Sequence, residues 1–312
     1  VTTRTVASLA AGASNTATTS LTMPTTIQAG IYHLCALADS AIPDTVDETD
    51  ENNNTFCNDT EVVTVRPADL IVNVVSTTSV TAKVGERITV QNSVQNIGGA
   101  GSGPFTLALS LSRDAFYGGP DDLSLTHRTV LNLTGEGAAS TSTAFTIVQI
   151  PTTASAGDYY ICALADSGAV VTESSEGNNT LCSSSTINVP KPDLIMTALT
   201  TTATSVAKGG SFSLSNTVKN QGGSVAGNFS IRFVLSPNAV IGDADDVSLS
   251  PERGLASLGV GVSSAANSTL TVPPATPSGI YQIGAIADVN NTVDEEREDN
   301  NTLLAPTMIT VP

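Results

Sequence analysis

Apolar and polar residues alternate in short runs along most of the chain, and this period of two predicts β-strands. The clearest runs lie at 70–74, 88–94, 105–111, 144–148 and 159–164. Gly, Pro, Asn and Asp separate the runs, and no apolar stripe with the 3.6-residue period of a helix competes with them. Roughly seven strands in about 120 residues are typical of a β-sandwich. We therefore expect an all-β chain built from seven-stranded sandwich modules.

The chain repeats its own sequence in tandem, which predicts an array of modules. The front part of the unit occurs twice: Pro67-Ala68-Asp69-Leu70 returns as Pro192-Asp193-Leu194, Gln95-Asn96-Ile97-Gly98-Gly99 returns as Lys219-Asn220-Gln221-Gly222-Gly223, and Leu111-Ser112 with Asp121-Asp122 returns as Leu235-Ser236 with Asp245-Asp246. The back part occurs three times. In each copy a strand ends in Ala-Asp, and the motif Val-x-Glu-x-x-Glu-x-Asn-Asn-Thr follows at 46–55, 171–180 and 293–302.

These repeats set the expected domain boundaries. We expect the C-terminal half of a module at 1–65 and complete modules at 66–189 and 190–312. The linkers 66–68 and 190–192 contain proline, so they should be extended and fairly stiff. A start within a module and an end on a linker proline favour a window from a longer array.

The four motifs in this fixed order resemble CARDB modules, the cell-adhesion-related domains of bacteria that also occur in archaea. The motifs are the Pro-x-Asp-Leu opening, the Asn-x-Gly-Gly turn, the Leu-Ser segment followed by Asp-Asp, and the Glu-x-x-Glu-x-Asn-Asn close. The resemblance covers nearly the whole chain. It implies a seven-stranded immunoglobulin-like fold on secreted or surface proteins, and some family members carry such modules beside secreted hydrolases.

The four cysteines occupy two equivalent positions of the repeat. Cys35 and Cys162 lie in the strand before the Ala-Asp end, and Cys57 and Cys182 follow the Asn-Asn-Thr triplet. The third copy lacks both cysteines, and this paired loss favours disulfides that join Cys35 to Cys57 and Cys162 to Cys182. Neighbouring antiparallel strands would bring each pair within bridging distance. Buried free thiols and a zinc site are the alternatives, although no Cys-x-x-Cys spacing supports zinc. Disulfides indicate an extracellular or cell-surface setting.

Charge excludes two classes of partner. The chain has 29 acidic and 12 basic residues, a net charge of −17, and no basic cluster. Nucleic acid binding requires clustered cations, so we exclude it. An anionic membrane would repel this surface, and no run of eighteen apolar residues could span one. Cations, basic partners or mutual repulsion of the molecules remain as explanations of the charge.

Catalytic motifs are absent from the sequence. His33 and His127 lie in different modules at unrelated positions, so each is best explained as an ordinary strand residue. No nucleophile elbow, phosphate-binding loop or His-Glu-x-x-His motif occurs. We therefore expect no catalytic residues, no enzyme activity and no firmly assigned cofactor.

The recurring acidic residues are candidates for calcium ligands, because hard cations prefer six to eight oxygen ligands. The candidates are Asp39, Glu48, Glu51, Asp121, Asp122, Asp166, Glu173, Glu176, Asp245, Asp246, Asp288, Glu295 and Glu298. In a head-to-tail array the last loop of one module should face the Asp121-Asp122 loop of the preceding module, where a shared cation would offset repulsion. The simpler alternative is that Asp and Asn form Asx-turns and loop caps while Glu is solvated.

Three functions fit these features. The first is a structural subunit of an extracellular filament or surface fibre, whose partners are copies of itself or further modules. The second is an adhesin or stalk that binds glycan or protein, with Phe116 and Tyr117 as the best candidate contact. The third is an accessory segment of a larger secreted hydrolase.

Overall fold

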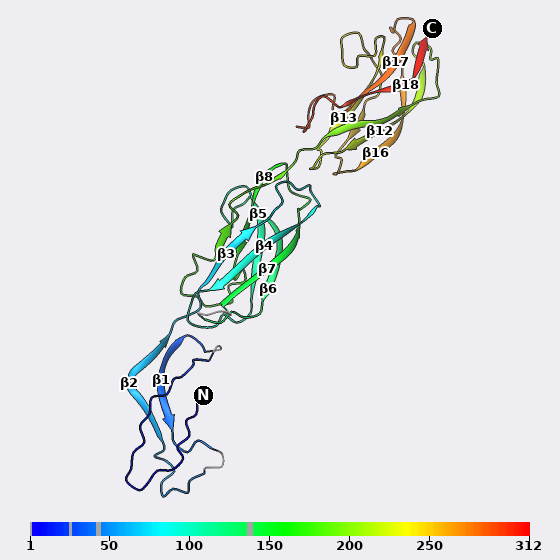
Figure 1. The fold of residues 1–312 in the computed structure, drawn as a ribbon. Helices are drawn as coiled ribbons and strands as arrows, with labels where there is room; N and C mark the ends of the chain where they lie inside the picture. The colour runs from blue at the N-terminus through cyan, green and yellow to red at the C-terminus, as the bar shows by residue number, and fades with distance from the viewer. Residues whose placement is uncertain (1, 25–26, 42–44, 136–139) are drawn as a thin grey trace.

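The computed structural model describes residues 2–24, 27–41, 45–135 and 140–312. The regular elements assigned in these residues are all strands, as the alternating pattern predicted. They form successive β-sheet units that follow one another along an elongated molecule (Figure 1). Fully antiparallel pairing joins neighbouring strands in every sheet.

The second module is a sandwich of two sheets. One sheet has the order β3–β4–β7, and the other has the order β10–β8–β5–β6 with β9 also paired to β8. Because β9 and β10 share the same neighbour, the module has seven strand positions, as expected. The strands are β3 (Leu70–Ser76), β4 (Arg87–Asn96), β5 (Phe105–Ser112), β6 (Leu123–Val130), β7 (Thr141–Gln149), β8 (Gly157–Leu164), β9 (Thr180–Cys182) and β10 (Ile187–Val189).

The third module repeats this topology. One sheet has the order β11–β12–β16, and the other has the order β14–β13–β17–β18 with β15 also paired to β13. Here the strand after β13 is divided into two short segments. The strands are β11 (Leu194–Thr200), β12 (Ser211–Asn220), β13 (Phe229–Ser236), β14 (Val247–Ser248), β15 (Arg253–Leu255), β16 (Ser263–Thr271), β17 (Gly279–Ile286) and β18 (Thr302–Val311).

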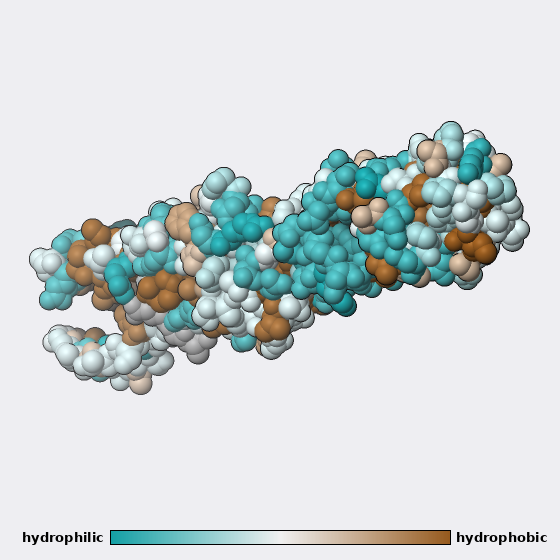
Figure 2. All heavy atoms as spheres, turned by 90° about the horizontal axis from the view of Figure 1, so that it is seen from above, coloured by the Kyte–Doolittle hydropathy of each residue, from teal (hydrophilic) through white to brown (hydrophobic). Residues whose placement is uncertain are grey.

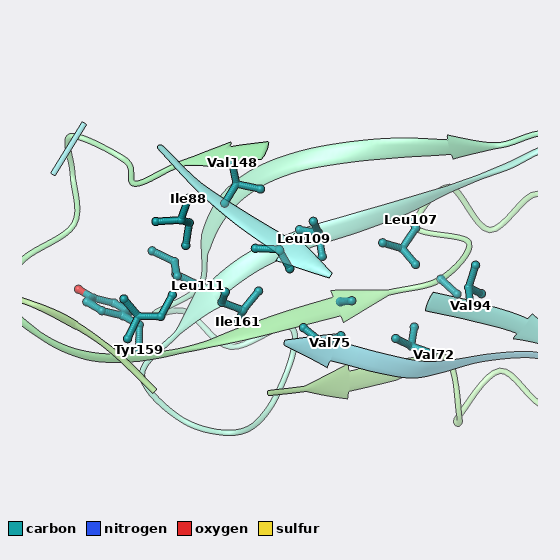
Figure 3. Packing of buried hydrophobic residues seen from close by; sticks show 14 of the residues in the cluster. Val72, Val75, Ile88, Val94, Leu107, Leu109, Leu111, Val148, Tyr159 and Ile161 are labelled. Atoms are coloured by element: carbon teal, nitrogen blue, oxygen red, sulfur yellow. The ribbon is translucent and has the colours of Figure 1, made fainter. Parts of the chain in front are cut away.

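Alternating side chains from both sheets form one hydrophobic core in each complete module. In the second module Leu107, Leu109 and Leu111 of β5 are at most 1% exposed. They pack against side chains of the other sheet, including Ile88 and Val148 (Figure 3). Burying one such side chain contributes about 1.5–3 kcal/mol, so this interdigitated layer is the main source of stability.

The first copy has less regular structure. Strands β1 (Gly30–Leu37) and β2 (Thr55–Val65) form a two-stranded sheet, and residues 2–24 carry no strand. Its strand register resembles that of the third module, because Gly30 pairs with Val65 as Gly279 pairs with Val311. The space-filling view shows this end of the molecule divided into two arms with a gap between them, at the left of Figure 2.

Candidate functional site: the linker end of each module

A fully buried asparagine organises the end of each complete module where the linker enters. Asn96 and Asn220, the first residues of the two Asn-x-Gly-Gly motifs, are 0% exposed. The side-chain oxygen of Asn96 accepts hydrogen bonds from the Asp69 and Gly98 amides at 3.0 and 2.9 Å. Its amide group donates to carbonyl oxygens of the loops at Ala100, Leu133 and Thr134. One side chain thereby joins the first strand to two loops.

The third module repeats this arrangement. Asn220 accepts hydrogen bonds from the Asp193 and Gly222 amides and donates to the Ser224 and Leu258 carbonyls. Buried backbone amides and carbonyls are costly when unpaired, so the asparagine helps to satisfy this end of the module. It pairs the Asp193 and Gly222 amides and adds a second hydrogen bond to the Leu258 carbonyl, which also accepts from the Ala226 amide. The sequence identified this asparagine as part of a turn motif but not as a structural anchor.

The glycine of the same motif allows the linker to lie directly on the turn. A Cβ atom on Gly98 would lie 2.2 Å from the Pro67 carbonyl oxygen and 2.6 Å from the Asp69 nitrogen. A Cβ atom on Gly222 would lie 2.4 Å from the Asp193 nitrogen. The Gly99 amide also donates to the Pro67 carbonyl at 3.0 Å. The linkers are therefore held by the modules that follow them, which gives a physical cause for the predicted stiffness.

A glutamate from the last loop completes the linker end. Glu295 is 4% exposed and accepts hydrogen bonds from the Leu194 amide and from the Asn301 side chain. Burial raises the pKa of Glu295 to about 7, against the opposing effect of these two hydrogen bonds. Glu173 accepts equivalent bonds from the Leu70 amide and Asn179, and burial raises its pKa to about 7 as well. Both carboxyls were predicted as calcium ligands, but these oxygens hold the first strand of the module.

The opening aspartate bonds to the closing asparagine motif. Asp69 accepts a hydrogen bond from Asn178 at 2.8 Å, and Asp193 accepts one from Asn300 at 2.8 Å. The backbone adds a second connection, because the Glu296 amide donates to the Pro192 carbonyl. Three of the four repeated motifs therefore meet in one hydrogen-bonded network, which explains why they recur together.

The aspartates that end the Ala-Asp strands cap the following loop. Asp39, Asp166 and Asp288 have φ values of 45°, 49° and 46°, in the left-handed region that Asp tolerates better than most residues. The carboxylate of Asp166 accepts hydrogen bonds from the Val170 and Val171 amides. Those of Asp39 and Asp288 accept equivalent bonds from their own loops. The contacts of these three residues are therefore those of aspartates that cap loops, which was the simpler alternative to calcium binding.

The second glutamate of the motif has a local partner in two copies. Glu51 accepts a hydrogen bond from the Glu48 amide, and Glu298 accepts one from the Glu295 amide. Glu48 is partly buried, whereas Glu176 is exposed. Through these hydrogen bonds Glu51 and Glu298 stabilise the conformation of their own loops. The contacts do not indicate a metal ion.

The Asp-Asp loops lie at the opposite end of each module. Asp121 accepts a hydrogen bond from the Arg113 amide, which lowers the pKa of Asp121, and Asp122 accepts one from the Gly118 amide. In the third module one carboxylate oxygen from each of Asp243, Asp245 and Asp246 lies within 4.8 Å of the others. The second module has Gly119 in place of Asp243. The sequence had singled out only two members of this cluster.

Direct contacts join the second module to the third. The Val84 amide donates to the Gly223 carbonyl at 2.9 Å, and the Lys83 ammonium donates to the Gln221 carbonyl at 3.2 Å. Val260 of the third module packs against the core of the second. Lys191 of the linker forms an ion pair with Asp294 at 2.7 Å, and the two side chains are 43% and 81% exposed. Calcium shared between carboxylates of the two modules stays a prediction, because the hydrogen bonds described above keep those carboxylates within their own modules.

The remaining predicted residues lie away from this network. Disulfides join Cys35 to Cys57 and Cys162 to Cys182, each across a pair of adjacent antiparallel strands. His33 is exposed, with Nδ1 3.0 Å from the Asn58 carbonyl oxygen, and His127 is exposed on β6.

The two aromatic residues in the loop of the second module differ in their exposure to solvent. Phe116 is 66% exposed, whereas Tyr117 is partly buried. Burial raises the pKa of Tyr117, and the nearby Asp122 carboxylate acts in the same direction. Of these two residues, only Phe116 presents an open aromatic ring to solvent.

Comparison with protein families places the chain among CARDB proteins. The CARDB model matches residues 1–58, 67–183 and 191–305, so the chain belongs to this family in three tandem copies. CARDB is a family of non-catalytic domains, and its modules are associated with the cell surface. Among curated proteins, no relative matches the chain.

Solved structures of single domains resemble parts of the chain. A CARDB domain from Pyrococcus furiosus, determined in complex with di-metal ions, is 24% identical, covers 39% of this chain and 90% of its own, and has a TM-score of 0.28. A domain of a proposed cell surface protein from Methanosarcina acetivorans is 20% identical, covers 39% and 93%, and has a TM-score of 0.28. A β-glucosidase from Listeria innocua is 15% identical over 39% of this chain but only 16% of its own, with a TM-score of 0.24.

In the described part of the chain no helix is long and apolar enough to cross a membrane.

Adding a methyl group at the turn should loosen the linker. We expect Gly98→Ala to lower the free energy of unfolding of the second module by about 1–3 kcal/mol, because the new Cβ atom must displace linker backbone. Gly177→Ala in the same module is the control, since a Cβ atom there meets nothing within 4 Å. Urea unfolding followed by circular dichroism measures both variants, and equal midpoints would contradict the account.

The buried glutamate should make the third module less stable at higher pH. The unfolded chain ionises Glu295 near the ordinary pKa of 4.5 and the folded module near about 7. Its contribution is therefore fully present below pH 4.5 and is lost as the pH rises through about 7. Glu295→Gln stays neutral, so we expect its unfolding free energy to fall less between pH 5 and pH 8, by about 2–3 kcal/mol. Glu296→Gln, an exposed neighbour, is the charge-matched control. Identical pH slopes in both variants would contradict this assignment.

Proposed function

We propose that the chain is a structural component of an extracellular filament or surface fibre built from tandem β-sandwich modules. The observation that carries this proposal is the clamping of each linker by the module that follows it. A linker fixed by Asn96 and Gly98, or by Asn220 and Gly222, transmits orientation from one module to the next. Such linkers suit a load-bearing rod better than they suit a flexible tether.

The contacts between modules support the same function. Backbone and side-chain hydrogen bonds from Lys83 and Val84 reach across the junction, and Val260 adds apolar contact. The groove beside this junction, of about 450 Å³, is open and is lined by residues 152–156 together with Asn228 and Asp294. The described residues assemble no catalytic constellation around it, so we assign the junction a mechanical role.

The chemistry of the surface supports an extracellular location. Two disulfides require an oxidising setting to form and persist. Charged residues make up only 13% of the chain, and Ser, Thr and Asn supply most of the remaining polar surface. A net charge of −17 makes the molecules repel one another, which keeps the chain soluble.

The adhesin is the second candidate because Phe116, in a loop of the second module, has an aromatic ring open to solvent. Phe116 could supply a contact for a glycan or a protein. Val240 occupies the matching place in the third module and is 57% exposed, so the aromatic contact does not recur along the array. A loop contact of this kind, present in the second module and not in the third, favours a stalk with one binding position. An accessory role beside a secreted hydrolase stays open, and it requires a catalytic domain outside these 312 residues.

Electron microscopy of native material, with and without a calcium chelator, tests the filament proposal. We expect long uniform fibres with an axial repeat of one or a few modules. Fibres that disperse in chelator would support calcium at the acidic loops, and fibres unchanged by chelator would count against it. Isolated short rods in both conditions would contradict the filament and favour a stalk or an accessory segment.

A further inference from the structure

Strand β7 forms one edge of the second module, and large apolar side chains lie on its solvent face. β7 pairs with β4 without a register shift, and within the described residues it pairs with no other strand. Every second residue of β7 is exposed to solvent. Phe145 and Ile147 are two of these residues, and they are 70% and 67% exposed. An aromatic and an aliphatic side chain therefore neighbour each other on the open face of an edge strand.

The backbone groups of the same two residues point toward the open edge. Just after β7, the Ile150 amide donates to the Glu86 carbonyl, and the Gly85 amide donates to the Ile150 carbonyl, each at 2.9 Å. Both of these bonds lie on the β4 side of the strand. The direction of the backbone groups alternates from residue to residue in an antiparallel ladder. The amides and carbonyls of Phe145 and Ile147 therefore point away from β4.

The other edge strands of this module have features that oppose pairing with a further strand. A register shift interrupts the pairing of β3 and that of β6, and β10 has only 3 residues. Strand β7 has 9 residues, without a charge, a proline, a glycine or a bulge. A long, regular and uncharged edge is a template for pairing with another strand.

The matching strand of the third module differs in both respects. In β16 the Thr271 amide donates to the Ser250 carbonyl at 2.8 Å, so the segment between β14 and β15 covers part of the edge. Asn267 and Thr269 occupy the positions of the two apolar residues of β7. The open apolar edge is therefore specific to the second of these two modules, and the shared fold does not require it.

The charge around β7 suits a second copy of this chain as the partner. Strands β3, β4 and β7 contain no acidic residue, and Arg87 is the one charged residue among them. The net charge of −17 makes copies of the chain repel each other. This repulsion acts over roughly 8 Å at physiological ionic strength. Two copies therefore meet least repulsion where they approach through a sheet that carries no acidic side chain.

Antiparallel pairing of β7 with its own copy is self-complementary. A two-fold axis beside Thr146 places Phe145 opposite Ile147 of the partner subunit, and the reciprocal pair forms by symmetry. In this register both residues direct their amides and carbonyls at the shared edge. Main-chain hydrogen bonds and two aromatic–β-branched pairs then form together. A contact of this kind uses the same surface on both copies and closes after two of them.

We propose that the open edge of β7 is an interface through which two copies of this chain pair side by side, so that their three-stranded sheets become one continuous sheet. The contact is confined to one strand, so a single pair of chains should associate weakly and reversibly. In a fibre, tethered chains make many such contacts together, which raises the overall affinity. The interface supplies lateral contacts between rods, so its biological role rests on the proposed function.

Sedimentation equilibrium of the full 312-residue chain over a range of concentrations tests the interface. We expect monomers in equilibrium with dimers. A double variant, Phe145→Thr with Ile147→Thr, removes the apolar pairs but should fold, because threonine suits a strand. Its dimer dissociation constant should rise by at least about 10-fold. Ile280→Thr is the matched control, because Ile280 of β17 is 61% exposed on another strand and its loss should leave dimerisation unchanged.

Hydrogen exchange and cross-linking locate the contact. The amides of Phe145 and Ile147 should gain protection as the protein concentration rises, whereas those of Asn267 and Thr269 in β16 should not. A photoreactive phenylalanine at position 145 should give a cross-linked dimer in which residues 141–149 of both copies are joined. The same photoreactive residue at Phe116, which is 66% exposed in a loop, should give no such dimer.

Three results would overturn the β7 interface. These are a chain that stays monomeric at every concentration, a dimer that survives the double variant, and cross-links from position 145 to a different surface. Native fibres formed by chains that do not dimerise through β7 would contradict this interface but not the filament. Paired chains in solution without fibres in native material would contradict the filament alone.

Discussion

At the linker end of each module, several backbone amides and carbonyls lie outside the β-ladders. A buried asparagine side chain forms hydrogen bonds with them. Asn96 and Asn220 each bond to the first strand, to the following glycine and to loop carbonyls. An unpaired buried amide or carbonyl costs about 1–3 kcal/mol, so replacing such an asparagine would expose several costs together. The glycine two residues later lets the linker approach, and the buried glutamate fixes the first strand from the other side. Module stability and linker stiffness thus have a common origin.

The linker end also shows what the repeated motifs have in common. The repeated motifs are spread over the sequence, yet most of them meet within a few ångströms at the point where one module is attached to the next. The acidic residues that the sequence offered as calcium ligands are largely occupied by backbone amides there. Asp166 and Asp288 cap loops, and Glu173 and Glu295 hold first strands. Metal binding is therefore not needed to account for their recurrence.

Much of the fold could be predicted from the sequence, because strand period, repeat length and turn residues act locally. The alternation at 105–111 predicted a strand, and the paired loss of cysteines in the third copy indicated the connectivity of the two disulfides. The role of Asn96 could not be predicted, because its partners at Leu133 and Thr134 are far away in the chain. The cluster of Asp243 with Asp245 and Asp246 was incomplete for a different reason, since the conformation of a local loop decides which carboxylates converge. Long-range polar contacts produce no periodic pattern in the sequence. Only the repetition of the motifs indicated that these residues matter.

Linkers that are fixed to the following module should hold neighbouring modules in one orientation. Double electron–electron resonance measures this, with spin labels on non-natural amino acids at Leu131 in the second module and Val240 in the third, both of which are exposed. The account predicts a single narrow distance distribution that does not change with ionic strength. A broad distribution, like that of a flexible linker of the same length, would contradict it.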